Sequence, residues 1–207
     1  MNWLAHVFLS ENHIEYQLGN LLTDPLKGKG WEGASDYIYQ GIETHKLIDS
    51  FTDTHPMVSK SKARLTERGH LKGVVIDILH DHFLSLHWNQ FSNIPLNDFL
   101  DTFRSQAPLA IINYPPRAKE VIGKVVNNRQ LGSYSKMQGV HDAFGRIDTR
   151  LSQRALKKDT ATRYIPLIKR EEKKLEEDFL VFFPDLMKAV HKQMGYKTPK
   201  HWKGMLI

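Results

Sequence analysis

The stretch from Val74 to Trp88 constrains the fold most strongly, because it is apolar over a greater length than an ordinary strand. We expect it to form a helix that is buried on most of its sides. Five ionisable side chains interrupt it: Asp77, His80, Asp81, His82 and His87. A carboxylate buried in such a helix needs a cation or matched hydrogen-bond donors. The alternative is a surface helix whose two aspartates are solvated.

A second segment, residues 45–53, carries a histidine and two carboxylates at positions i, i+4 and i+8: His45, Asp49 and Asp53. On a helix such positions stack along one face, with Cβ atoms about 5–6 Å apart. Two further polar residues, His6 and Asp24, stand beside apolar runs. Imidazole and carboxylate together suit a hard or borderline divalent cation, so the sequence predicts a metal site in a helical core. An amphipathic helix with a solvated polar side remains the alternative for the 45–53 segment.

The rest of the chain is punctuated as a series of helices. Apolar spacing predicts helices over residues 2–10, 13–22, 35–51, 56–68 and from about 70 to 90. Ser35 is a favourable N-cap, and Pro56 suits a first helical position. Pro95 and the Pro115-Pro116 pair begin two more helices, and Pro184 interrupts a long charged helix and starts the last one. Strand signals are almost absent, so we predict a single all-α domain, a helical bundle, over residues 1–207.

Composition narrows the class of protein. The chain has 207 residues and no cysteine, which excludes disulfides, a cysteine nucleophile and thiolate metal ligands. No apolar run approaches the ~20 residues that span a bilayer, and the N-terminal sequence lacks the basic region of a signal peptide. We therefore expect a cytoplasmic protein without a membrane partner. The formal charge of +6 favours acidic partners, either a nucleic acid or an acidic protein, although a generically basic surface would give the same charge.

Basic residues lie close in sequence to the predicted metal site: Lys27, Lys29, Lys60, Lys62, Arg64, Arg68 and Lys72. A metal site bordered by positive charge suits an anionic substrate, most naturally a phosphate ester, whereas the alternative is a solvated helix face. The chain contains no Walker-type phosphate loop and no G-x-S-x-G nucleophile elbow. We expect five other histidines at the surface or in local caps: His13, His55, His70, His191 and His201.

Four motifs occur in the order and at the spacing of a known family. They are Asn2-Trp3-Leu4-Ala5-His6, Gly19-Asn20-Leu21-Leu22-Thr23-Asp24, Gly41-Ile42-Glu43-Thr44-His45 through Asp49, and Asp81-His82-Phe83-Leu84-Ser85-Leu86-His87-Trp88. In these motifs the chain resembles the acyl carrier protein phosphodiesterase family, also called acyl carrier protein hydrolase. The match is dense over about the first 90 residues and thinner around Pro115-Pro116-Arg117 and Phe182-Phe183-Pro184.

The resemblance implies a helical fold related to the metal-dependent histidine–aspartate (HD) phosphohydrolases. It also implies a reaction in which water cleaves the phosphodiester that joins 4′-phosphopantetheine to holo acyl carrier protein, with manganese (Mn2+) as the metal. By position, the metal ligands would be His6, Asp24, His45 and Asp81, and the residues with supporting or acid–base roles would be Asp49, Asp77 and His82. The partner would be holo acyl carrier protein rather than a nucleic acid, and the oligomeric state stays open.

Two parts of the chain depart from the family pattern. His80 stands where the family often has an aromatic residue, so we do not expect it to bind metal. The segment Gln130–Ser152 fits poorly, which argues against a role for it in carrier binding. Two other functions remain open: a related phosphohydrolase that acts on a nucleotide or another small phosphate ester, and a non-catalytic basic module that binds an acidic protein or nucleic acid.

Overall fold

The computed structural model describes residues 1–66, 68–127 and 130–204, and every named element in these ranges is helical. The α-helices are α1 (Trp3–Phe8), α2 (Ile14–Leu22), α3 (Asp36–Thr54), α4 (Pro56–Leu65), α5 (Lys72–Leu86), α6 (Trp88–Phe91), α7 (Leu96–Ala110), α8 (Pro116–Asn127), α9 (Met137–Asp148), α10 (Gln153–Leu156) and α11 (Ile165–Gln193). The short 3-10 helices are η1 (Ile111–Asn113), η2 (Gln130–Ser135) and η3 (Thr162–Tyr164). The prediction of an all-α protein is confirmed.

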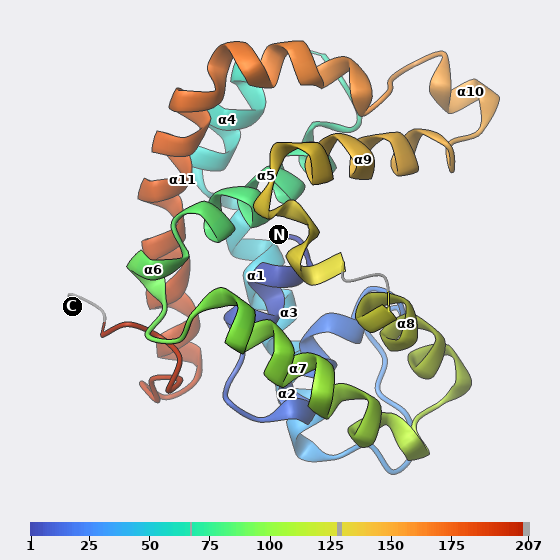
Figure 1. Ribbon diagram of the computed structural model, residues 1–207, viewed down its shortest axis with the longest axis vertical. Helices are drawn as coiled ribbons and strands as arrows, with labels where there is room; N and C mark the ends of the chain where they lie inside the picture. The colour runs from blue at the N-terminus through green and yellow to red at the C-terminus, as the bar shows by residue number, and fades with distance from the viewer. Residues whose placement is uncertain (67, 128–129, 205–207) are drawn as a thin grey trace.

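The first helix lies at the centre of the molecule. Figure 1 shows α1 and the N-terminus near the middle, with α11 along one side and α9 and α10 at one end. Helix α1 packs against α2 and α5, and α2 packs against α3. Its residues Leu4, Ala5, Val7 and Phe8 are fully buried. A polar side chain on this helix is therefore held inside the core.

Helices α2 and α3 cross so closely that glycine is required at the contact. A Cβ atom on Gly19 would overlap the backbone of Ile38, and a Cβ atom on Gly41 would overlap the backbone of Tyr16 and Asn20. Without these side chains the two backbones approach closely, as small residues allow. The crossing places residues 20–24, at the end of α2, beside the middle of α3.

Some predicted helix boundaries are confirmed and others are wrong. Pro56 begins α4, where the His55 side chain accepts a hydrogen bond from the Met57 N–H (3.3 Å). Ser35 precedes α3 as predicted, but its hydroxyl donates to Glu15 (2.8 Å) and makes no capping bond. The prediction that Pro184 restarts the chain is wrong, because Pro184 lies inside α11, a continuous helix of 29 residues from Ile165 to Gln193. The buried phenylalanines around Pro184 offset the lost helical hydrogen bond.

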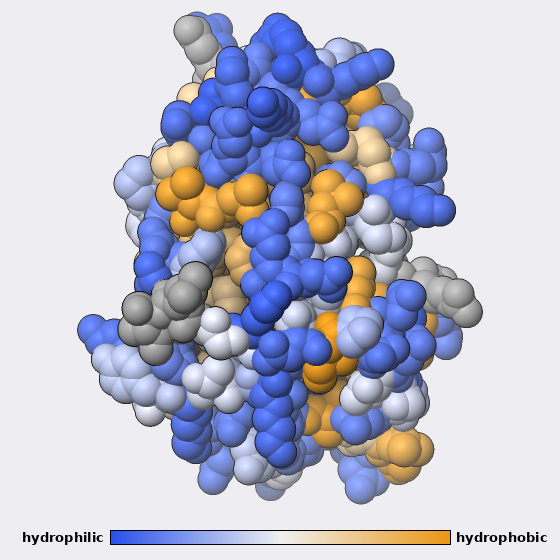
Figure 2. Space-filling model, turned by 60° about the vertical axis from the view of Figure 1, so that its left-hand side comes forward, coloured by the Kyte–Doolittle hydropathy of each residue, from blue (hydrophilic) through white to orange (hydrophobic). Residues whose placement is uncertain are grey.

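Two histidines predicted at the surface are buried. His201 is fully buried, and its Nε2–H donates to the carbonyl of Phe8 (2.6 Å). His191 is also buried and lies 3.0 Å from the Thr198 hydroxyl. Hydrophilic side chains cover most of the face in Figure 2, with apolar patches between them. In the described part of the chain, no helix is both long and apolar enough to cross a membrane.

Candidate metal centre and adjoining cavity

Four of the seven predicted site residues come together at the α2–α3 crossing. Nε2 of His45 lies 2.9 Å from an oxygen of Asp49, one turn further along α3, and 3.2 Å from an oxygen of Asp24. Nε2 of His6 on α1 lies 3.4 Å from the other Asp49 oxygen. The two imidazole rings stack with centroids 4.2 Å apart. We call these four residues the histidine–aspartate cluster.

The side chain and backbone of Asn20 fix the direction of both rings. Nδ1 of His45 lies 2.8 Å from the Asn20 carbonyl, which can only accept, so Nδ1 carries the proton. Nδ1 of His6 lies 2.8 Å from Asn20 Oδ1, while Asn20 Nδ2 donates to the carbonyl of His6 and to Ser10. Both Nε2 atoms are therefore directed at the carboxylates, an arrangement typical of metal-binding histidines.

Charge is unevenly distributed in the metal-free cluster. Burial by itself would lower the pKa of His45, but hydrogen bonds to Asp24 and Asp49 raise it to about 9. Burial lowers the pKa of His6. Against the effect of burial, hydrogen bonds from His45 and His6 hold the pKa of Asp49 well below its usual value. The cluster thus favours ionised carboxylates and one positive charge beside them.

The donor set fits a divalent cation. One ligand atom from each of His6, His45 and Asp49 can be chosen so that all lie within 4.8 Å of one another. A neutral Nε2 lone pair this close to a carboxylate oxygen is repelled unless a proton or a metal ion lies between them. Nitrogen and oxygen donors without sulfur suit manganese, iron, magnesium or zinc. The Asp24 side chain, 81% exposed, leaves one side of the cluster open to solvent.

The structure does not bring Asp81 into the histidine–aspartate cluster. Its two carboxylate oxygens accept hydrogen bonds from the backbone N–H groups of Leu4 (2.8 Å) and Ala5 (3.0 Å), in the first turn of α1. Burial raises the pKa of Asp81 to about 7, although these two N–H groups act in the opposite direction. Asp81 therefore caps the helix that carries His6, and metal ligation by Asp81 stays a prediction.

Asp77 lies beside the cluster, joined to it through the amino group of Met1. That nitrogen is 3.2 Å from an oxygen of Asp77 and 3.6 Å from an oxygen of Asp49. The two carboxylates thus share a positive charge. Asp77 is partly exposed and reaches a cavity on its other side. This position suits the supporting role predicted for Asp77.

His82 and His80 lie outside the cluster. Nδ1–H of His82 donates to the carbonyl of Tyr134 (2.6 Å), so this buried ring connects α5 to η2. His80 stacks on Phe182, and burial holds the pKa of His80 well below its ordinary value. Its Nδ1 lies 3.2 Å from the sulfur of Met1. A catalytic role for His82 stays a prediction that these contacts do not require.

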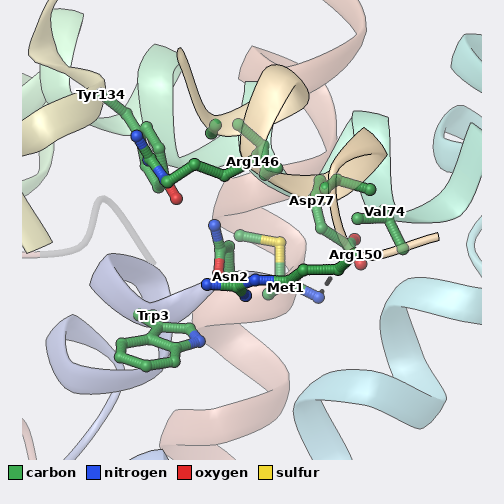
Figure 3. Close-up of a pocket in the computed structure, with 11 residues that line it drawn as sticks. Met1, Asn2, Trp3, Val74, Asp77, Tyr134, Arg146 and Arg150 are labelled. Carbon is green, nitrogen blue, oxygen red and sulfur yellow. Dashed lines mark ion pairs between the residues drawn. The ribbon is translucent and has the colours of Figure 1, made fainter. Parts of the chain in front are cut away.

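A cavity of about 230 Å³ adjoins Asp77 (Figure 3). Met1, Asn2 and Trp3 line it from the N-terminus, Val74, Asp77 and Ile78 from α5, and Tyr134, Ala143, Arg146, Ile147 and Arg150 from the 130–150 region. The poor fit of that region to the family pattern had argued against a role for it in carrier binding. The available signal was the spacing of Arg146 and Arg150, one helical turn apart beside the apolar Ile147.

Three of the seven basic residues predicted to border the site pair with carboxylates elsewhere. Arg64 forms two hydrogen bonds with the buried carboxylate of Asp178 on α11 (2.6 and 3.1 Å). Lys60 also approaches Asp178 (3.4 Å), and Lys62 pairs with Asp53 (3.2 Å). These side chains connect α4 to neighbouring elements. The positive charge at the cavity comes from α9 and the residues that follow it.

These features define an all-helical protein whose buried histidine–aspartate cluster is suited to a divalent cation and lies beside a cavity with two arginines. Comparison with known families identifies it further. The chain belongs to the acyl carrier protein phosphodiesterase family, whose sequence model matches residues 1–186. The predicted resemblance is confirmed.

Curated relatives agree with this assignment. An acyl carrier protein phosphodiesterase of Yersinia pestis is 31% identical over 198 residues, which cover 94% of this chain and all of the relative. One from an Enterobacter species is 29% identical over 197 residues, with 94% of this chain and all of the relative covered. One from Pectobacterium atrosepticum is 29% identical over 72% of this chain and 79% of its own length. No solved structure matches significantly.

Proposed function

We propose that this protein is a metal-dependent hydrolase that removes 4′-phosphopantetheine from holo acyl carrier protein and leaves the apo carrier. The substrate class follows from the family and from the names of its relatives. The observation that carries the metal dependence is the orientation of two buried Nε2 atoms at carboxylate oxygens 2.9–3.4 Å away. A cation between these groups relieves their repulsion.

In this proposal His6, His45, Asp49 and Asp24 hold the cation, with Mn2+ as the expected metal. A bound divalent cation would polarise a phosphoryl oxygen and lower the pKa of the attacking water. Asp49 was predicted to have a supporting role, but here it serves as a ligand, because its carboxylate contacts both imidazoles. We assign Asp81 to positioning, because its oxygens already hold α1.

The protein supplies the other parts of the reaction through its own side chains. Asp77, between the cluster and the cavity, is placed to accept a proton from water at the edge of the cavity. His82 holds the η2 carbonyl of Tyr134 and thereby shapes one cavity wall. We also propose kinship with the HD phosphohydrolases, supported by the histidine–aspartate ligand chemistry, and action in the cytoplasm, which suits a chain without cysteine.

Intact mass spectrometry of a holo acyl carrier protein tests the function directly. The carrier is incubated with the protein in the presence of Mn2+ or of a chelator. We expect loss of the whole 4′-phosphopantetheine mass with Mn2+ and no loss with the chelator. His45→Gln should abolish the loss, whereas His70→Gln, at an exposed position, should leave it unchanged.

Two results would count against this function. An unchanged carrier mass, from folded protein across several divalent metals, would rule out the proposed substrate. Faster cleavage of generic small phosphodiesters than of holo carrier would favour the related phosphohydrolase instead.

A further inference from the structure

The wall of the cavity opposite the N-terminus carries two cations without counter-charges. Five other arginines each pair with an aspartate or glutamate: Arg64, Arg104, Arg117, Arg163 and Arg170. Within the described ranges, neither Arg146 nor Arg150 forms an ion pair with a carboxylate. Both line the cavity, and both are exposed enough to meet a solute. Unpaired guanidinium groups on a concave surface are suited to an anion.

The scaffold that carries these arginines is firmly anchored. Val140, Ala143 and Phe144 are buried as α9 packs against α5 and η2. At the C-terminal end of α9, the carboxylate of Asp148 accepts hydrogen bonds from the backbone N–H groups of Ala161 (2.6 Å) and Thr162 (3.1 Å). Because the apolar face of α9 is buried and its C-terminal end is held, the backbone positions of Arg146, within α9, and Arg150, two residues beyond it, are well defined.

One of the arginines is also oriented directly. The side chains of Arg146 and Asn2 lie near the Tyr134 hydroxyl and lower its pKa against the effect of burial, and Figure 3 shows Arg146 extended toward Tyr134. Arg150, one turn further on, makes no side-chain hydrogen bond among the described residues. Apolar groups of Trp3, Ile78 and Ile147 complete the lining. The cavity thus combines two cationic positions with an apolar wall.

We propose that Arg146 and Arg150 form a subsite for the phosphate group of 4′-phosphopantetheine, in the cavity beside Asp77. This inference rests on the proposed function and adds the residues that hold the substrate anion. Planar guanidinium groups match the oxygens of a phosphate ester and bind it bidentately. Asp77, which lines the cavity, is joined to Asp49 of the histidine–aspartate cluster through the Met1 amino group, so a phosphate held here would be separated from the proposed cation by these two contacts. The apolar wall suits the methyl groups of the pantetheine arm.

Calorimetric titration of the whole protein with free 4′-phosphopantetheine, in the presence of Mn2+, tests the subsite. Pantetheine, which lacks the phosphate, is the comparison ligand. We expect Arg146→Gln and Arg150→Gln each to weaken binding of the phosphorylated compound about tenfold, with little effect on pantetheine. Glutamine keeps a hydrogen-bond donor for Tyr134 but removes the charge. In turnover, these substitutions should raise KM for holo carrier more than they lower kcat.

Arg154→Gln on α10 is the matched control, because it removes the same charge from an exposed arginine that does not line the cavity. Arg150→Gln keeps the test decisive even if Arg146→Gln unfolds, since Arg150 has no side-chain partner to lose. Unchanged affinity in a folded Arg150→Gln protein, or an equal loss in Arg154→Gln, would overturn the subsite.

Arginine-dependent binding of 4′-phosphopantetheine without cleavage of holo carrier would support the subsite and reject the proposed function. Cleavage of holo carrier with a normal KM in both Arg146→Gln and Arg150→Gln would support the proposed function and reject the subsite.

Discussion

At the scale of the residue, Asn20 determines how the cluster can bind a cation. Its Oδ1 atom and its carbonyl each accept a hydrogen bond from one imidazole. Its Nδ2 atom donates to the His6 carbonyl (3.0 Å) and to Ser10 (2.9 Å). The polar atoms of this fully buried side chain are thus used to hold the two imidazole rings in place. A buried amide that orients metal-binding histidines affects metal affinity without touching the metal.

We expect Asn20→Ala to weaken Mn2+ binding by about 10–100-fold, because His6 would lose the acceptor that fixes its ring. Calorimetric titration of metal-free protein with Mn2+ measures the effect. Ser10→Ala is the control, since it removes a partner of the same amide but leaves the contact between Oδ1 and His6. Wild-type affinity in Asn20→Ala would show that the amide does not orient the ligand.

At the scale of the element, α1 is too short to be stable by itself. It has six residues, whereas isolated helices under about 12 residues are marginal in water. The Asp81 carboxylate on α5 satisfies two N–H groups of its first turn, and burial of its apolar side chains supplies the rest. His6 therefore depends on α5 for its position.

We expect Asp81→Ala to lower the free energy of unfolding by about 2–4 kcal/mol, because two buried N–H groups lose their acceptor. Asp81→Asn should be milder, since its amide oxygen still accepts a hydrogen bond. Chemical denaturation in the presence of a chelator is the informative measurement. A capping role predicts the loss without metal, whereas a role only as a ligand predicts equal stability of wild type and variant under these conditions.

The α2–α3 crossing offers a second test at this scale. We expect Gly41→Ala to cost more than about 2 kcal/mol, because its methyl group would overlap the backbone of α2 and separate Asn20 from His45. Mn2+ affinity should fall with stability. Gly123→Ala on α8, where a Cβ atom meets open space, should instead stabilise the protein by about 0.5–1 kcal/mol. Equal thermal stability of the two variants would contradict the close crossing.

At the scale of the whole molecule, local patterns predicted the helices and part of the site. Helical spacing was sufficient for the all-α class, and His45 and Asp49 could be paired because they lie one turn apart. His6 and Asp24 were singled out as polar residues beside apolar runs, and the family resemblance gave them the role of ligands. Contacts between distant segments were not predictable in this way. No local pattern indicates that Asp81 caps α1, or that Arg64 pairs with Asp178 on α11.

The wrong predictions have the same cause, because they also depend on contacts between segments that are distant in sequence. Pro184 is a helix breaker by local rules, but packing of the residues around it keeps α11 continuous. His201 looks like a polar residue in a C-terminal segment, yet it is buried against α1. Tertiary packing overrides local preference at both positions. The arginines of the cavity were missed because the segment that carries them differs from the family pattern.

The C-terminal segment completes the support of α1. The carbonyl of Phe8, at the end of α1, accepts hydrogen bonds from Nε2–H of His201 (2.6 Å) and from the Trp202 indole (2.9 Å). The central helix is thus held at one end by α5 and at the other by residues nearly two hundred positions away in sequence. Burial lowers the pKa of His201 from its usual 6.5 to about 4, so this ring is neutral in the folded protein at neutral pH.

This shift predicts a loss of stability in mild acid. The unfolded chain binds a proton at His201 below about pH 6.5, whereas the folded protein binds it only near pH 4. Stability from the neutral ring is therefore complete above pH 6.5 and falls as the pH drops toward 4, by up to about 3 kcal/mol. Denaturation of His201→Gln between pH 7 and pH 4 should show a shallower decline than wild type. His70→Gln, at an exposed position, should decline as wild type does, and parallel curves for all three proteins would mean that His201 is not held neutral against α1.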